Sequence, residues 1–286
     1  MKGFTKKIVS VVLALTMVFA VATTAMAASW EPYFGKDSGW KEGGSGTLEN
    51  NTATGFTAKI THLGWGGIWG IQAKNNAVKV NKGTAYAVTF KASSSKLNKF
   101  LYVKMAKDGT EKVSGAFWVL LKRGKNVNVN EVFVAKENSK LLTIGMGGED
   151  FDRSGIDADA DIRYGIFNKQ YKGKFVAKAK CGLDADGLFD SAPTDIKVSN
   201  FKITPAAKKV SFKAKAKGKK KVQLKMKKAA GVYTYQIQVG KVKKKTTKAT
   251  YTVKAKKKGK QTVKVRGISQ NKAYTTKWTS KKVKVK

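Results

Sequence analysis

The chain has 286 residues, with 58 Lys or Arg against 18 Asp or Glu, and so a net charge of +40 at neutral pH. A single Cys and a single His exclude a disulfide framework and any metal site built on several histidines. The charge is uneven, because the last 81 residues, from Ala206 to Lys286, contain 29 Lys or Arg and no acidic residue. Partners are therefore considered separately for the two parts of the chain.

Residues 1–27 contain the three parts of a secretory signal peptide. Lys2, Lys6 and Lys7 form a positive region, Ile8 to Ala22 is almost entirely apolar, and Ala25-Met26-Ala27 is an A-x-A cleavage site. The apolar stretch is shorter than the roughly 20 residues that span a membrane, and no second long apolar stretch follows it. The sequence predicts export, an extracellular or cell-wall-associated protein, and no membrane span in its mature form.

Residues 28–204 predict an antiparallel β-domain. Short stretches alternate apolar and polar side chains, and Gly, Asn, Asp and Ser separate them. The predicted strands are 56–60, 86–90, 101–105, 126–134, 141–144 and 196–203. No convincing helical period occurs in the mature chain. The domain is long for a simple immunoglobulin-like sandwich, so we expect a jelly roll of two packed sheets.

Residues 205–286 predict a second β-domain, which begins at Pro205. About seven short strands follow it, and Lys alternates with Val, Leu or Tyr along them. One face of each strand would then be core and the other lysine. Strand number and length predict a seven-stranded β-sandwich rather than a disordered basic tail, and five aromatic side chains support a folded core.

Two stretches of the first domain resemble a known sequence signature. They are Ile68-Trp69-Gly70-Ile71-Gln72-Ala73-Lys74 and the run from Gly83 through Tyr86, Val88 and Phe90 to Ala92. In order and spacing they resemble the W-x-x-Q … G-x-x-Y-x-V-x-F-x-A signature of jelly-roll carbohydrate-binding modules grouped around families four, nine and twenty-two. The ending Asp195 to Ile203 resembles the last strand of these modules. The resemblance implies a polysaccharide-binding jelly roll.

The second domain resembles the Lys-rich fibronectin type III domains of secreted Gram-positive proteins. The resemblance is carried by residues 222–228, 235–239, 263–266 and 277–286. Met226 stands where a core Trp is common in that family, and Gln261 stands near the usual Tyr of the second-last strand. The resemblance implies a fibronectin type III-like β-sandwich.

The candidate carbohydrate-binding residues are Trp65, Trp69, Trp118, His62 and Gln72. Sugar rings stack their C–H faces on aromatic rings, and amides bind their hydroxyls. Trp65 lies in a Gly-rich loop that can present a ring, and Trp118 follows Gly115 in a second expected loop. Trp69 could equally be core, Gln72 a solvent-facing strand residue, and His62 a polar loop residue. Trp30 and Trp40 are expected to pack in the fold.

Acidic residues suggest two further sites. Carbohydrate-binding modules of this kind often hold one structural calcium ion, and the resemblance makes Glu31, Asp37 and Asp195 its candidate ligands. No other cofactor is expected. The cluster from Glu149 to Asp161 could pair carboxylates as a glycosidase does, but the second Glu of a laminarinase-like motif is missing. The expectation is therefore that the protein is not an enzyme.

Three triple-lysine runs lie in the second domain, at Lys219–Lys221, Lys243–Lys245 and Lys256–Lys258. Export makes nucleic acid a poor partner, whereas an anionic cell-wall polymer offers the same electrostatic attraction. A lysine-covered face that only confers solubility is the alternative. Together these features predict a secreted, non-catalytic polysaccharide-binding protein with a cationic attachment or spacer domain. The alternatives are a divergent polysaccharide-degrading jelly roll and a purely structural surface protein.

Overall fold

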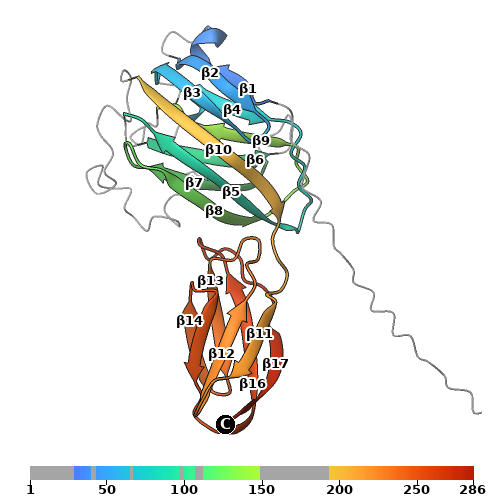
Figure 1. Cartoon of the computed structure of the whole chain (residues 1–286). Helices are drawn as coiled ribbons and strands as arrows, with labels where there is room; N and C mark the ends of the chain where they lie inside the picture. Colours follow the sequence, from blue (N-terminus) through green and yellow to red (C-terminus); the bar gives the residue numbers. More distant parts are fainter. Residues whose placement is uncertain (1–28, 40–42, 65–66, 97–98, 107–111, 149–192) are drawn as a thin grey trace, which may run out of the picture.

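The computed structural model describes residues 29–39, 43–64, 67–96, 99–106, 112–148 and 193–286. Apart from two short 3₁₀ turns, η1 (Gly35–Ser38) and η2 (Gly67–Gly70), the regular structure of this part of the chain is entirely β. It forms two sandwiches that lie end to end, and strand β10 runs from the first towards the second (Figure 1). The described residues contain no helix long and apolar enough to cross a membrane. The predicted all-β fold class is confirmed.

The first sandwich consists of two five-stranded antiparallel sheets, here called sheet one and sheet two. Sheet one has the order β1 (Glu31–Phe34), β4 (Ile71–Asn75), β9 (Leu141–Gly145), β6 (Lys99–Ala106) and β7 (Val113–Leu121). Sheet two has the order β2 (Ser45–Thr52), β3 (Gly55–His62), β10 (Thr194–Pro205), β5 (Ala85–Ser94) and β8 (Val127–Val134).

The strand order identifies the first sandwich as a jelly roll. Without the outer strands β1 and β2, the sheets read β4-β9-β6-β7 and β3-β10-β5-β8. From β3 to β10, consecutive strands change sheet at every step except the β6–β7 hairpin, which lies within sheet one, and this is the double Greek key of an eight-stranded jelly roll. The sequence did not predict β1, β2 and β7. Strand β2 is a polar edge strand with no fully buried position, so it carries little apolar alternation.

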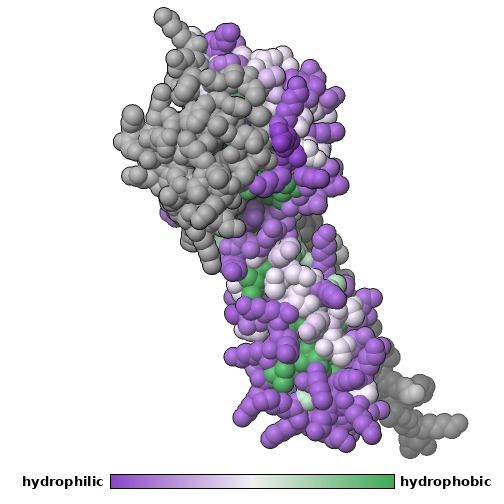
Figure 2. Space-filling view, turned by 90° about the vertical axis from the view of Figure 1, so that its left-hand side faces the viewer, coloured by the Kyte–Doolittle hydropathy of each residue, from purple (hydrophilic) through white to green (hydrophobic). Residues whose placement is uncertain are grey.

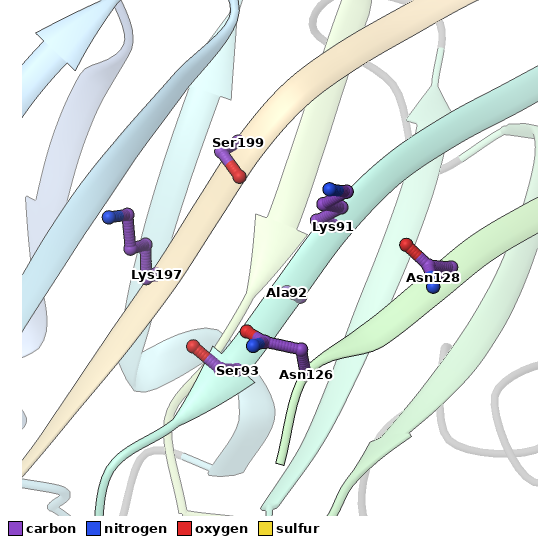
Figure 3. Close-up of a pocket in the computed structure, with 7 residues that line it drawn as sticks. All are labelled: Lys91, Ala92, Ser93, Asn126, Asn128, Lys197 and Ser199. Carbon is purple, nitrogen blue, oxygen red and sulfur yellow. The ribbon is translucent and has the colours of Figure 1, made fainter. Parts of the chain in front are cut away.

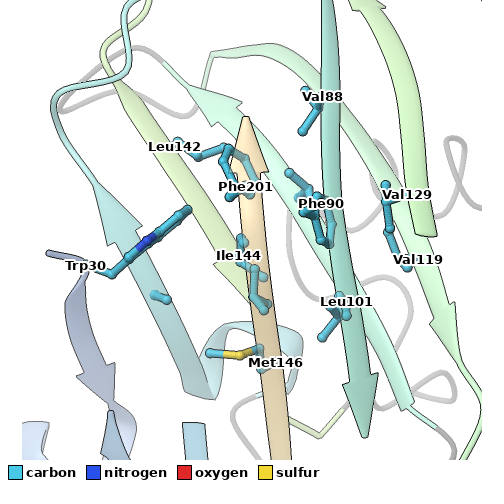
Figure 4. Packing of buried hydrophobic residues seen from close by; sticks show 14 of the residues in the cluster. Trp30, Val88, Phe90, Leu101, Val119, Val129, Leu142, Ile144, Met146 and Phe201 are labelled. Atoms are coloured by element: carbon cyan, nitrogen blue, oxygen red, sulfur yellow. The ribbon is translucent and has the colours of Figure 1, made fainter. Parts of the chain in front are cut away.

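The jelly-roll core lies between the two sheets and is rich in aromatic rings. Trp30 packs edge-on against Phe56 and Phe201, with ring centroids 5.3 and 5.2 Å away. Phe90 stacks on Phe201 at 5.3 Å, and Leu101 of sheet one belongs to the same cluster (Figure 4). The interpretation of Trp30 as a packing residue is confirmed.

Strand β8 carries apolar side chains on both of its faces. The sequence predicted a strand over 126–134 but did not assign its valines to a face. Strand β8 pairs with β5 in one unbroken register, and Val129 and Phe133 point into the core. Glu131, between them, therefore points inward, and Val132 and Val134 point outward.

The second sandwich packs a three-stranded sheet on a four-stranded sheet. The first has the order β11 (Phe212–Ala216), β12 (Lys221–Met226) and β15 (Thr250–Lys254). The second has the order β14 (Val242–Thr246), β13 (Thr234–Val239), β16 (Gly259–Ile268) and β17 (Thr279–Val285). This is a fibronectin type III-like arrangement. The alternation Lys209-Val210-Ser211-Phe212 predicts a first strand over 209–212, which is wrong, because β11 starts at Phe212.

As the sequence predicted, strands of the second sandwich bury apolar side chains on one face and expose lysines on the other. Val222, Leu224 and Met226 of β12 are buried in its core, and Lys221 and Lys225 between them are exposed. Met226 is thus a core residue of this sandwich. Hydrophilic side chains cover most of the outer surface of this sandwich, with a few apolar patches between them (Figure 2).

Candidate functional site

The outer face of sheet one carries a row of side chains that crosses all five strands. Register places Tyr33 (β1) opposite Gln72 (β4), Gln72 opposite Gly145 (β9), Gly145 opposite Tyr102 (β6), and Tyr102 opposite Trp118 (β7). We call these five residues the sheet-one row. Neighbouring strands lie about 4.8 Å apart, so the row spans about 19 Å. Tyr33 and Gln72 are partly exposed, whereas Gly145, Tyr102 and Trp118 are buried, so a ligand can reach only the β1–β4 end of the row.

Trp69 lies above the middle of the sheet-one row. It comes from η2, just before β4, and its ring meets that of Tyr102 edge-on at 5.2 Å. Gly145 makes room for it, because a Cβ there would lie 2.9 Å from the Ile68 carbonyl oxygen and 3.3 Å from the Trp69 ring. Only glycine lets the ring lie this close to the sheet.

Polar groups fix Trp69 in this position. The side-chain amide of Gln72 donates a hydrogen bond to the Trp69 carbonyl oxygen at 2.7 Å. The Lys104 ammonium lies 4.1 Å from the ring centroid, within cation–π distance. A second such pair joins Lys74 and Tyr33 at 4.7 Å. Trp69 and Gln72 are held in place yet keep intermediate exposure, so both remain accessible to a ligand.

The far end of the sheet-one row is buried. Tyr102 and Trp118 are 0 and 1 % exposed, and their ring centroids lie 4.7 Å apart. Neither belongs to the core between the sheets. The expectation that Trp118 sits in a loop and presents its ring is wrong, because Trp118 lies inside strand β7 and its ring is buried. Its ring supports Tyr102 and, through Tyr102, Trp69.

The remaining sequence candidates lie apart or outside the described residues. His62 is the last residue of β3, in sheet two, and is partly exposed. Trp65, Trp40 and the acidic cluster 149–161 are outside the described residues. Sequence reasoning missed Tyr33, Tyr102 and Lys104. Tyr102 and Lys104 could have been found in the sequence. They alternate with the core residues of Leu101-Tyr102-Val103-Lys104-Met105 and so lie on the outer face of the strand, where an aromatic ring is unusual.

The candidate calcium ligands are not brought together. Glu31 lies in β1, where its carboxylate accepts a 3.4 Å hydrogen bond from Asn76, and Asp37 lies in η1. Asp195 lies in β10 and pairs with the Lys59 ammonium at 2.7 Å. Across the described residues, no three His, Cys, Asp or Glu side chains gather as a metal site would require. The calcium site remains a prediction from the resemblance alone.

Comparison with known proteins gives weak structural likenesses. No protein-family model and no curated protein sequence matches the chain. A CBM4 structure is 13 % identical, covering 62 % of this chain and 87 % of its own, with a TM-score of 0.39. The N-terminal cellulose-binding domain of *Cellulomonas fimi* β-1,4-glucanase C is 12 % identical over 63 % of this chain and 90 % of its own, with a TM-score of 0.36. Likenesses this weak indicate no function for this chain.

Proposed function

We propose that the protein is a secreted, non-catalytic polysaccharide-binding protein whose jelly roll binds glycan at Trp69 and the exposed end of the sheet-one row. The observation that carries the proposal is the partly exposed Trp69 ring, which Gly145 and the buried Tyr102 hold beside Gln72, with Tyr33 next to Gln72 in the row. An aromatic ring with an adjacent amide provides both contacts that a sugar requires, stacking and hydrogen bonding.

The second sandwich is proposed to attach the protein to an anionic cell-wall polymer. Its sheets place lysines directly opposite each other at Lys213–Lys225, Lys221–Lys254 and Lys260–Lys284. Directly opposed like charges destabilise a sheet. No acidic residue occurs anywhere in this region to offset them. A polyanion bound along these strands would remove the repulsion, which is a physical reason to infer a binding role rather than a spacer role.

The glycan-binding proposal is tested with Trp69→Ala and Gln72→Ala in calorimetric titrations against soluble β-glucans and xylans. Loss of a stacked ring should cost about 2 kcal/mol, or roughly thirty-fold in affinity. Trp278→Ala is the matched control, because Trp278 is also a partly exposed Trp in a cation–π pair, with Arg266 at 4.7 Å, but lies in the other sandwich. Equal affinity for Trp69→Ala and Trp278→Ala, with both folded, would refute the site. Release of reducing sugar by the intact protein would refute the non-catalytic assignment.

A further inference from the structure

The outer face of sheet two carries a hollow that the proposed function does not use. It has a volume of about 230 Å³ and is lined by Ala92 and six polar residues from or beside three neighbouring strands. The six are Lys91, Ser93, Asn126, Asn128, Lys197 and Ser199, shown in Figure 3. Strands β10, β5 and β8 hold them, and Asn126 immediately precedes β8. The hollow and the sheet-one row therefore lie on opposite outer faces of the jelly roll.

Strand register holds the two lysines of the hollow close together. Lys91 lies opposite Ser199 on one side and Asn128 on the other, and Ser93 lies opposite Lys197. Lys91 and Lys197 are thus diagonal neighbours, whose Cα atoms lie about 7 to 8 Å apart in an antiparallel sheet. Both side chains are exposed. Two lysines carried this close together on one face repel each other, and an anion bound between their ammonium groups would be attracted by both.

The acidic side chains that the structure describes give these two lysines no counter-charge. Among the described residues, neither Lys91 nor Lys197 takes part in an ion pair. Asp195 is on the same face and only two residues from Lys197, but its carboxylate is paired with Lys59. Glu49 lies on β2, two strands away from β10, and acts on Lys59 as well. Glu131, on β8, points into the sandwich.

The other lining groups suit a hydroxylated ligand. Asn126 and Asn128 each offer an amide donor and acceptor, and Ser93 and Ser199 each offer a hydroxyl. None of the described residues that line the hollow is aromatic, so they offer neutral sugars no ring to stack on. We propose that this hollow is a second glycan site, which binds acidic sugar units through carboxylates placed between Lys91 and Lys197. The jelly roll would then hold a neutral chain on one face and an acidic one on the other.

The test uses the full mature chain and tetragalacturonate, a tetramer of uronic acid, at about 0.15 M salt. Binding is followed by NMR at the side-chain amides of Asn126 and Asn128, so that contacts with the Lys-rich sandwich do not contribute to the signal. Lys91→Gln/Lys197→Gln should weaken this binding at least about ten-fold, since hydrogen bonds to charged groups contribute more than neutral ones. The matched control is Lys213→Gln/Lys225→Gln, which removes two exposed, directly opposed lysines from the other sandwich.

Three outcomes would overturn the proposal. The control double variant could weaken the amide-detected binding as much as Lys91→Gln/Lys197→Gln does, which would indicate diffuse charge attraction. The methyl-esterified, neutral tetramer could bind with equal affinity, which would remove the role of the carboxylates. Tetragalacturonate could also leave both Asn side-chain amides unshifted. Unchanged circular dichroism spectra of both variants are required, and both pairs of substitutions lie at exposed positions where folding is not at risk.

Discussion

The side-chain amide of Asn271 in the second sandwich donates a hydrogen bond to the carbonyl oxygen of Val132 in the first, at 2.8 Å. The Val132 side chain is 1 % exposed and packs in a small apolar cluster with Ala87 and Ala206. Gly231 of the second sandwich packs against Val132, and a Cβ at this glycine would lie 2.6 Å from the Val132 side chain. Its φ of +73° also favours glycine. The two sandwiches therefore meet in a packed interface as well as through the covalent connection.

We predict that Val132→Asp separates the sandwiches and that Val134→Asp does not. The two valines lie on the same face of β8, but Val134 is 44 % exposed, so only Val132 would place a carboxylate in an apolar contact. Residual dipolar couplings measured by NMR should fit one common alignment in the Val134→Asp variant and two independent alignments in Val132→Asp. A common alignment in both variants would show that the interface does not fix the two sandwiches.

Glu131 gives a prediction for the pH dependence of stability. Burial raises the pKa of its carboxyl from 4.5 to about 7, and its Oε2 has no hydrogen-bond partner among the described residues. Between these pH values the folded state binds more protons than the unfolded state, so stability should fall as pH rises through this window, by roughly 2 to 3 kcal/mol at most. Glu131→Gln should flatten the urea-unfolding free energy from pH 4.5 to 7 and raise it at pH 8.

Glu137→Gln is the control for this experiment. Glu137 lies near the end of the same chain segment, is partly exposed, and pairs with Lys82 at 3.5 Å. Its replacement should leave the fall in stability between pH 4.5 and 7 in place. If both variants keep the wild-type slope, the titration of Glu131 does not control it.

Strand β8 shows what alternation alone can and cannot predict. The period of two located the strand correctly, but Val129, Val132 and Val134 could not reveal that the apolar residues change from one face to the other. An apolar side chain is favoured on the outer face at Val132 because the second sandwich covers it there. Ala206, which packs against Val132, lies more than 70 residues further along the chain. Local patterns contain no information about such tertiary cover, so an outward valine and an inward glutamate were both unexpected.

The candidate site was predictable to a similar extent. Trp69 and Gln72 follow from the resemblance and lie at one site. The row itself depends on the register between β4, β9 and β6, which brings together residues 72, 145 and 102. Register is set by pairing between distant strands. Gly145 in particular has no sequence signal of its own, since its role is visible only once the Trp69 ring lies over it.

Chelation tests the remaining calcium prediction. Since Glu31, Asp37 and Asp195 do not gather, and Asp195 already pairs with Lys59, we expect EDTA to leave the thermal unfolding midpoint within about 1 °C. Differential scanning calorimetry with added calcium and with EDTA measures this midpoint. A rise of several degrees with calcium would show that a site exists. The variants Asp37→Asn and Asp195→Asn, each tested for loss of that rise, would then locate it.

Salt should release the second sandwich from anionic polymer. Its opposed lysine pairs and the absence of acidic residues produce a strong positive field, which decays over roughly 8 Å at 0.15 M salt and roughly 3 Å at 1 M. We therefore expect the protein to be retained on purified Gram-positive cell wall at the lower salt concentration and released at the higher one. Binding of a neutral polysaccharide at the sheet-one row, which depends on ring stacking, should change little over the same range and provides the internal control.

Lys213→Gln/Lys225→Gln should lower the salt concentration at which half the protein is released. Retention that persists at 1 M salt, or no retention at 0.15 M, would show that charge does not attach this domain to the wall.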